Sequence, residues 1–239
     1  MKTILFPADF LSHSPITVDY LRMMTKAYDA KVIVLHIYQP VVADATLPMF
    51  NDPGVGTVAA MDLETISQQH LTNMVEQLRA QGIEAVGEWR VGSIEDEIVD
   101  AARTYAPDLL ITHRTPATGF FDRLVGSSAT DVARQAPCPV LFIGQKEEVA
   151  PTQIRRVAYV LQQGITQQTV TDQTKTIVDA FDADLTVISP DQLDGTHPDL
   201  FVIQRKETGF LGGLMGTDPT EKLLATARVP VLVFHERKE

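Results

Sequence analysis

The sequence lacks a second cysteine, a long apolar run and an excess of positive charge. Its single cysteine, Cys138, excludes an intrachain disulfide and is typical of proteins from a reducing cytoplasm. No apolar run is long enough to cross a membrane. The opening MKTILFPADF lacks the apolar core of a signal peptide, because Pro7 and Asp9 interrupt it. We therefore expect a cytoplasmic protein with no membrane partner.

The net charge of −11 excludes further classes of partner. A chain this acidic is a poor match for nucleic acid or for an anionic membrane surface. Any phosphate that it binds must be held by local donors, because the overall field repels anions. The 239 residues, 44% of them hydrophobic, can form one large core or two small ones.

Motifs of enzymes and metal sites are also absent from the sequence. There is no Walker loop and no nucleophile elbow with an accompanying Ser, His and Asp order. No second cysteine or pair of histidines has metal-ligand spacing. We therefore predict no catalytic residue and no metal site.

What the sequence does contain is alternation of apolar strands and amphipathic helices. Such alternation predicts an α/β fold, a parallel sheet with helices on both faces. Strands are expected at residues 4–7, 32–35, 83–91, 109–112, 139–143, 157–161 and 185–188, and helices from Ser12 or Ser14 to Tyr28, over 61–82, after Ser93 and over 166–181.

Several details of these elements are specific enough to check. Gly82 is expected to end a helix, and Ser93 with Asp96 resembles a capping box. Residues 40–59, rich in Pro, Gly and Asp, read as a lid or a mobile excursion. Buried positions are expected at Leu63, Ile66, Leu71, Met74, Leu78, Ile94, Ile98, Ala101, Ala102 and Cys138, whereas Glu95, Asp96 and Glu97 read as a solvated face.

The chain also repeats itself at two spacings. Ile4 matches Val157 and Asp29 matches Asp182, each 153 positions later. The motif Pro-Asp-Leu at 107–109 recurs at 198–200, and Pro-Val-Leu at 139–141 recurs at 230–232, both 91 positions later. The fall from 153 to 91 means that about 62 residues are missing from the second copy. We predict a domain at 1–145 and a degenerate, shortened copy at 155–239, joined by a polar linker.

The stretch 107–141 contains the pattern of a phosphate-binding loop. A strand is followed by a loop with Gly119, then by Gly126, Ser127 and Ser128 at the start of a short helix. Backbone N–H groups and the helix dipole point toward an anion in such an arrangement. The plainer interpretation is a turn glycine at 119 and an ordinary helix cap at 126–128, and the sequence leaves both open.

The motifs ILFPADF, VIVLHI, VGSIEDEIVDAA, PDLLI and GFFDRLVGSSATDVARQAPCPVLFI, in this order, resemble the universal stress protein family. The resemblance covers the first copy to Gly144 but only the two ends of the second. It implies a five-stranded parallel sheet of the adenine-nucleotide α-hydrolase type. Family dimers pair through their last strand, so it also implies that the segments PVLFI and PVLVF join the two copies as an intramolecular pseudo-dimer.

The resemblance also implies site residues. Members that bind ATP carry Asp after the first strand and a small apolar residue after the second-strand His, which match Asp9 and Ile37. Their loop is Gly, two residues, Gly, nine residues, then Gly-Ser or Gly-Thr, and its last pair matches Gly126-Ser127. The implied cofactor is ATP or AMP with magnesium.

This chain departs from the family loop at both earlier glycines, where it carries His113 and Pro116. Proline removes a donor N–H, and histidine adds a ring that could donate to phosphate or fill the space. In the second copy, Asp9 is matched by Gln162, so that copy is not expected to hold a nucleotide in the family manner. His36, at the end of a buried strand, reads as a structural histidine.

Three functions follow from this resemblance. The first is a stress-response protein acting as a non-catalytic binding or regulatory module, with weak or no ATP binding and protein partners that the sequence does not identify. The alternative is an ATP- or AMP-binding stress protein that uses its first domain, with slow hydrolysis. An adenylating or thiol-transferring enzyme would need a further His or Lys motif that the sequence lacks. Whether two chains form a homodimer stays open.

Overall fold

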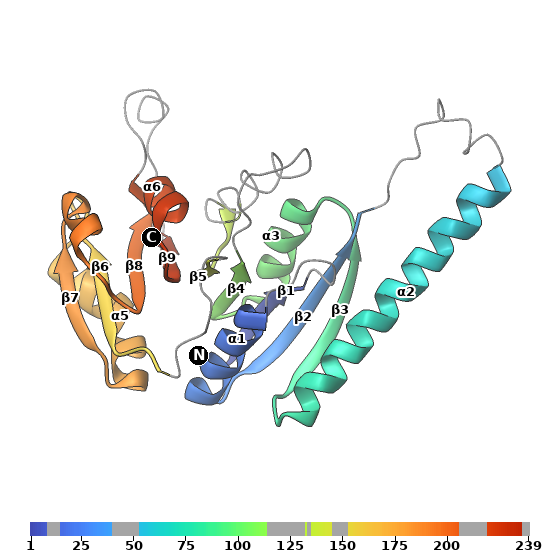
Figure 1. Cartoon of the computed structure of the whole chain (residues 1–239), viewed down its shortest axis with the longest axis horizontal. Coiled ribbons are helices and arrows are strands. Elements are labelled where there is room, and N and C mark those ends of the chain that lie inside the picture. Colours follow the sequence, from blue (N-terminus) through green and yellow to red (C-terminus); the bar gives the residue numbers. More distant parts are fainter. Residues whose placement is uncertain are drawn as a thin grey trace.

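The computed structural model places all its strands in one sheet (Figure 1). It describes residues 1–8, 15–39, 53–113, 132, 135–144, 153–205 and 219–235. The nine described strands run in the order β3-β2-β1-β4-β5-β9-β8-β6-β7. All neighbours pair parallel except β5 and β9, which pair antiparallel. The predicted α/β class with a mostly parallel sheet is therefore confirmed.

The first half of the sheet is the expected set of five parallel strands. The chain leaves β1 to form β2 and β3 on one side, and then returns to form β4 and β5 on the other. Its elements are β1 (Thr3–Pro7), α1 (Pro15–Tyr28), β2 (Lys31–Tyr38), α2 (Pro53–Ala80), β3 (Ala85–Val91), α3 (Ile94–Tyr105), β4 (Leu109–His113) and β5 (Val140–Ile143).

The second half of the sheet has four strands, and their connections follow the same pattern as those of the first half. From β6 the chain forms β7 on one side, and then β8 and β9 on the other. Its elements are β6 (Arg156–Val160), α5 (Gln167–Phe181), β7 (Asp184–Ile188), a short 3₁₀ helix η2 (Pro190–Gly195), β8 (Leu200–Arg205), α6 (Pro219–Thr226) and β9 (Val231–His235).

Helices cover both faces of the sheet, as predicted. Side chains of α1, α2 and α5 pack with Ile4, Val32 and Tyr159 on one face. Side chains of α3 and α6 pack with Leu5, Ile33 and Val160 on the other. The central strands are buried on both faces, which explains why their sequences are continuous apolar runs rather than alternating ones.

Several local predictions are confirmed. Gly82 takes a positive φ of +81° after α2, and its N–H donates to the Arg79 carbonyl at 2.9 Å. The α5 helix begins after Thr166, whose side chain accepts from the Thr169 N–H. Leu71, Met74, Leu78, Ile98, Ala101, Ala102 and Cys138 are all buried.

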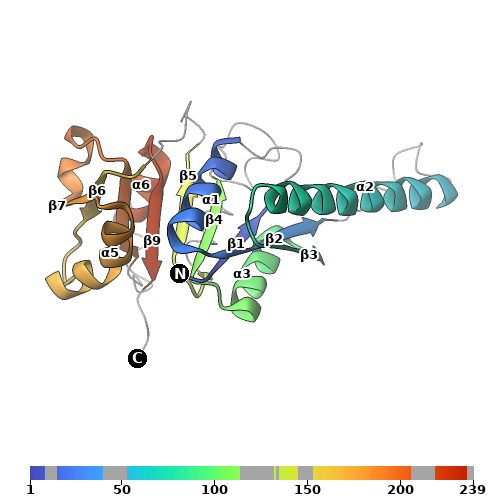
Figure 2. The ribbon, with the colours of Figure 1, turned by 90° about the horizontal axis from the view of Figure 1, so that it is seen from below.

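Other local predictions are wrong. The α2 helix begins at Pro53, so residues 53–59 are helical rather than part of an excursion. Proline suits the first turn of a helix, but two nearby glycines hide this start in the sequence. Ile66 of α2 is 50% exposed, and Ile94 is 43% exposed at the start of α3. The amino-terminal part of α2 runs beyond the edge of the sheet (Figures 1 and 2).

The helix start at Ser93 also differs from its prediction. Its side chain makes no cap bond to the backbone and instead donates to Glu95 at 3.1 Å. The expected capping box with Asp96 is therefore not formed. Glu97 is not simply solvated, because it pairs with Arg90.

Corresponding residues of the two halves make the same hydrogen bonds. A carboxylate oxygen of Asp108 accepts from the N–H groups of Lys2 and Thr3, and one of Asp199 accepts from those of Arg155 and Arg156. Asp29 and Asp182, 153 positions apart, both take a positive φ, of 48° and 49°. The same backbone geometry thus begins β1 and β6, and ends α1 and α5.

The two halves meet through β5 and β9. In the antiparallel register Leu141 lies opposite Leu232, with Val140 opposite Val233 and Phe142 opposite Val231. A second contact joins α1 to α5, where the rings of Tyr28 and Phe181 pack edge to face with centroids 6.2 Å apart. The Tyr28 hydroxyl also donates to the Thr176 carbonyl at 3.1 Å.

Candidate functional site

The sheet reverses its strand order between β1 and β4. In open parallel sheets, ligands bind at the carboxyl ends of the strands where such a reversal occurs. Here those ends are Pro7 of β1 and His113 of β4, with β2 and β5 on either side. We take this edge of the first half as the candidate site.

Hydrogen bonds fix the chain as it leaves β1. The N–H of Ala8 donates to the Leu35 carbonyl at 2.8 Å, and Nδ1 of His36 lies 3.1 Å from the Ala8 carbonyl oxygen. Ala8 is buried. The predicted structural role of His36 is therefore confirmed, and the bonds set the position from which the segment containing Asp9 begins.

Three aromatic rings lie along the carboxyl ends of β2 and β3. Trp89 lies opposite His36 in the β2–β3 register, and their ring centroids are 5.2 Å apart. The Tyr38 ring stacks on Trp89 at 5.8 Å with an interplanar angle of 18°. Trp89 is not among the predicted site residues, because only the strand register shows that it neighbours His36.

Ile37 is the predicted nucleotide contact that the structure describes. It lies in β2, is partly exposed, and packs against the α3 side of the sheet, away from the aromatic rings. Its partner in the register is Arg90. The side of Ile37 that faces α3 is thus next to a charged cluster.

Arg90 is held by three carboxylates. Its guanidinium lies 3.3 Å from Glu88, 3.3 Å from Glu97 and 2.6 Å from Asp100. Its side chain is only 14% exposed. These acids engage Arg90, so it ties α3 to the end of β3.

The turn between β3 and α3 is equally tight. A Cβ atom at Gly92 would lie 2.7 Å from Oε1 of Glu97, and the φ of Gly92 is +159°. A side chain at this position would displace the Glu97 carboxylate, and the positive φ also favours glycine.

The other predicted contacts, Asp9, Gly119, Gly126, Ser127 and Ser128, lie outside the described residues, as do Pro116 and the expected helix cap after Gly126. His113, which replaces the first loop glycine, is described: it ends β4 opposite Ile143 of β5. The structure thus brings Ile37 and His113 to the same edge of the sheet and leaves the loop between 114 and 131 as an expectation.

Thr17 adds a polar group that is not among the predicted site residues. It lies in the first turn of α1, soon after β1, and is only 1% exposed. Its hydroxyl has no hydrogen-bond partner in the described part of the chain. A buried hydroxyl without a partner costs about 1–3 kcal/mol, so it is a feature that needs an explanation.

At the corresponding edge of the second half, side chains bond to one another. The strand order reverses between β6 and β8. There Gln162 donates to the Gln204 carbonyl at 3.0 Å, Gln173 donates to the Gln204 side chain at 3.0 Å, and the buried Tyr159 hydroxyl donates to Gln173 at 2.8 Å. This glutamine network ties α5 to the ends of both strands.

Cys138 is 6% exposed, and burial raises the pKa of its thiol to about 12. A thiol with so high a pKa carries little thiolate and is a poor nucleophile. Among the residues that the structure describes, no three His, Cys, Asp or Glu side chains gather as they would around a metal ion. None of the described helices is long and apolar enough to cross a membrane.

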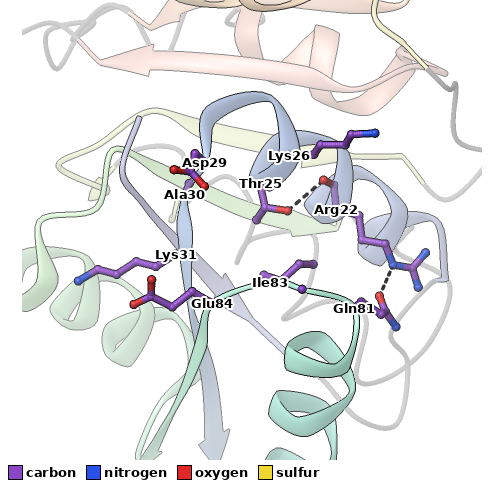
Figure 3. Close-up of a pocket in the computed structure, with 10 residues that line it drawn as sticks. Arg22, Thr25, Lys26, Asp29, Ala30, Lys31, Gln81, Ile83 and Glu84 are labelled. Atoms are coloured by element: carbon purple, nitrogen blue, oxygen red, sulfur yellow. Dashed lines mark hydrogen bonds between the residues drawn. The ribbon is translucent and has the colours of Figure 1, made fainter.

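A cleft of about 660 Å³ lies at the opposite, amino end of β2 and β3 (Figure 3). The end of α1, the start of β2 and the turn from α2 to β3 enclose it. In Figure 3, Lys31 and Glu84 lie beside each other at one end of the cleft, and Arg22 donates to Gln81 at the other. This cleft is not the nucleotide site that the sequence predicts.

Sequence comparison matches residues 1–144 to the model of the universal stress protein family. No curated protein is significantly similar to the chain.

Structure comparison extends the likeness to the whole chain. A universal stress protein from Archaeoglobus fulgidus superimposes with a TM-score of 0.72 at 14% identity, over 98% of this chain and 96% of that one. A functionally unknown protein from Pseudomonas aeruginosa superimposes with a TM-score of 0.68 at 16% identity, over 98% and 92%. At such identities the likeness is one of fold.

Proposed function

Because the chain belongs to the universal stress protein family, we propose that it acts in stress adaptation as a binding or regulatory module rather than as an enzyme. In this proposal the first half is the ligand-binding domain, and the second half is a shortened copy that occupies the place of a dimer partner. Nucleotide binding by the first half is weak, because the loop lacks two glycines at His113 and Pro116.

The β5–β9 register is the observation that supports a built-in dimer partner. In a twofold dimer, a residue on the axis faces its own counterpart, and the pairs on either side are exchanged. Leu141 faces Leu232, its counterpart 91 positions later. Tyr28 packs on Phe181, its counterpart 153 positions later, on the face that α1 and α5 cover.

The candidate site supports adenine-nucleotide binding by the first half alone. Its strand reversal is at the usual place for a ligand, Ile37 lies at the edge, and the unpartnered Thr17 hydroxyl is in the helix that follows β1. In the second half, the side chains of Gln162, Gln173 and Tyr159 at the corresponding edge are engaged in the glutamine network. We therefore propose one nucleotide site per chain.

The test is a calorimetric titration of the purified protein with ATP, AMP and magnesium. We expect a stoichiometry near one and a dissociation constant well above the micromolar range. Asp9→Ala should abolish the residual binding without unfolding the chain, and Gln162→Ala, at the matching position of the second half, should leave it unchanged.

Other outcomes would decide between the two candidate functions. Micromolar affinity at one site, lost in Asp9→Ala, would mean that the loop still works and that the chain is a nucleotide-binding sensor, with hydrolysis then to be measured. If Asp9→Ala and Gln162→Ala lost nucleotide binding equally, or if two nucleotides bound per chain, the single-site proposal would be contradicted.

A further inference from the structure

One buried hydroxyl of the first half has no equivalent at the matching position of the second half. Thr17 lies in the first turn of α1, is 1% exposed, and has no hydrogen-bond partner for its hydroxyl in the described part of the chain. The residue 153 positions later, in the first turn of α5, is the fully buried Val170. Valine has nearly the shape of threonine, so the two halves differ here by a methyl group against a hydroxyl.

The helices α1 and α5 correspond along their whole buried faces. Three successive positions of that face, each pair 153 residues apart, are buried in both helices: Thr17, Leu21 and Met24 of α1, and Val170, Thr174 and Ile177 of α5. An apolar side chain therefore fits the position of Thr17 in this packing. Threonine in α5 has a partner, because the Thr174 hydroxyl donates to the Val170 carbonyl at 2.7 Å.

The Thr17 hydroxyl thus lowers stability where a side chain of the same shape would not. A buried hydroxyl without a partner loses its bonds to water and gains none in return, whereas an apolar residue of the same shape avoids this loss. Packing gives no reason for the hydroxyl, and an unpaired buried group of this kind calls for a partner that the chain itself does not supply.

Thr17 is also in the right place to meet a ligand. The α1 helix follows β1 and packs over β4 and β5, so its first turn is at the carboxyl edge of the sheet. Leu109 and Ile111 of β4 point to the face that α1 covers. Side chains alternate along a strand, so His113 is on that face too.

The second half shows how near the two elements come at this edge. Gln173 of α5 donates to the side chain of Gln204, at the end of β8, at 3.0 Å. The residue that matches Gln173 is Tyr20, one turn after Thr17, and the residue that matches Gln204, 91 positions earlier, is His113. By this correspondence the start of α1 lies beside the end of β4, where the loop without its two glycines begins.

The start of α1 is chemically suited to a phosphate. The first N–H groups of a helix have no partner within it, and the positive end of its dipole favours an anion. Side chains tilt toward the amino end of a helix, so the Thr17 hydroxyl adds a donor at that end. A chain of net charge −11 needs such local donors, and these do not depend on the glycines that His113 and Pro116 replace.

We propose that the Thr17 hydroxyl donates a hydrogen bond to a phosphate oxygen of the nucleotide in the first half. The start of α1 then supplies part of the phosphate binding that the loop has lost. This inference rests on the proposed nucleotide binding and adds the group that distinguishes a nucleotide from its nucleoside. Val170 has no hydroxyl, so the second half lacks this contact.

Two threonine-to-valine variants separate this role from a structural one. Thr17→Val removes a hydroxyl without a partner, so the Tm of the ligand-free protein should stay the same or rise. Thr174→Val removes the hydroxyl that bonds to the Val170 carbonyl, so the Tm should fall. If Thr17→Val lowered the Tm as much as Thr174→Val, the Thr17 hydroxyl would have a partner within the protein, and the proposal would be overturned.

Calorimetric titrations with AMP and with adenosine test the contact itself. Thr17→Val should bind AMP at least about tenfold more weakly than the parent, because a bond to a charged oxygen is lost, and should bind adenosine as the parent does. Thr17→Ser keeps the hydroxyl and should bind AMP within about threefold of the parent. Thr174→Val is the matched control and should bind both ligands as the parent does.

The possible failures point to different errors. If the parent bound AMP and Thr17→Val bound it equally well, the role of Thr17 would be refuted while nucleotide binding stood. If Thr17→Val lost AMP and adenosine to the same extent, the contact would be to the nucleoside, and the phosphate assignment would be wrong. If the parent bound neither ligand, the proposed nucleotide binding would itself be refuted, and this inference with it.

Discussion

At the scale of single residues, Asp108 and Asp199 fix the starts of β1 and β6. Each accepts two backbone N–H bonds, at distances between 2.6 and 3.0 Å. We expect Asp108→Ala and Asp199→Ala each to lower the free energy of unfolding by about 1–3 kcal/mol, because backbone donors lose a charged acceptor. Chemical denaturation measures this, and Asp172→Ala, an exposed aspartate of α5, is the control.

The same aspartates give the stability a dependence on acid. Burial raises the pKa of each carboxyl, but the bonds from the strand starts, and from Arg156 in the case of Asp199, outweigh it and lower the pKa. A pKa lower in the folded state means that this stability is complete above the unfolded value of about 3.9 and is lost as the pH falls through the folded value. Asp108→Asn should therefore flatten the loss of stability below about pH 4. If the free energy of unfolding of Asp108→Asn fell below about pH 4 as steeply as that of the parent, Asp108 would not be a source of this acid dependence.

At the scale of elements, the turn after α2 depends on a left-handed residue. Gly82 has a φ of +81°, and no atom within 4 Å would contact an added Cβ. Gly82→Ala should therefore destabilise the protein by about 1 kcal/mol through backbone strain alone.

The matched control for this turn is Gly195→Ala. Gly195 also has open space around it, but its φ is not in the left-handed region. We expect this variant to be neutral or slightly stabilised in thermal unfolding. If Gly82→Ala and Gly195→Ala lowered the stability by the same amount, the left-handed conformation of Gly82 would not be the cause of the loss.

The sequence predicted the elements well where periodicity and end signals agreed. The α5 helix, with Thr166 before it and Phe181 at its end, and the buried strands β1 and β2 are such cases. The start of α2 was missed because Gly54 and Gly56 weaken the helical pattern. Ile66 and Ile94 were wrongly predicted to be buried, because periodicity shows which face of a helix is apolar but not which of its turns another element covers.

The candidate site was predictable only in part. Strand ends at Ile37 and His113 follow from the strand order of an α/β sheet. The neighbours of these residues do not: Trp89 beside His36 and Arg90 beside Ile37 require the β2–β3 register, which single-sequence patterns leave undetermined. The partnerless Thr17 hydroxyl is likewise a property of packing.

At the scale of the whole molecule, the single sheet predicts that both halves unfold together. Trp89, the only tryptophan, is in β3 and reports on the first half. Leu232, 1% exposed, is in β9 of the second half. Leu232→Ala should cost about 2–5 kcal/mol and shift the Trp89 fluorescence transition by the same amount as the circular dichroism transition.

A matched change outside the junction is Val170→Ala, a buried residue of α5. It should also move both transitions together if the sheet is one cooperative unit. If Trp89 fluorescence kept the parent midpoint in either variant while circular dichroism shifted, the halves would unfold independently.

The β5–β9 pair has a consequence for how the protein responds to its own abundance. A subunit contact weakens as a protein is diluted, so its occupancy follows the level of expression. Here both strands belong to one polypeptide, and a tether keeps their effective concentration in the millimolar range however few copies the cell contains. The junction is therefore insensitive to gene dosage, and it stays closed when the protein is scarce, at the onset of its synthesis.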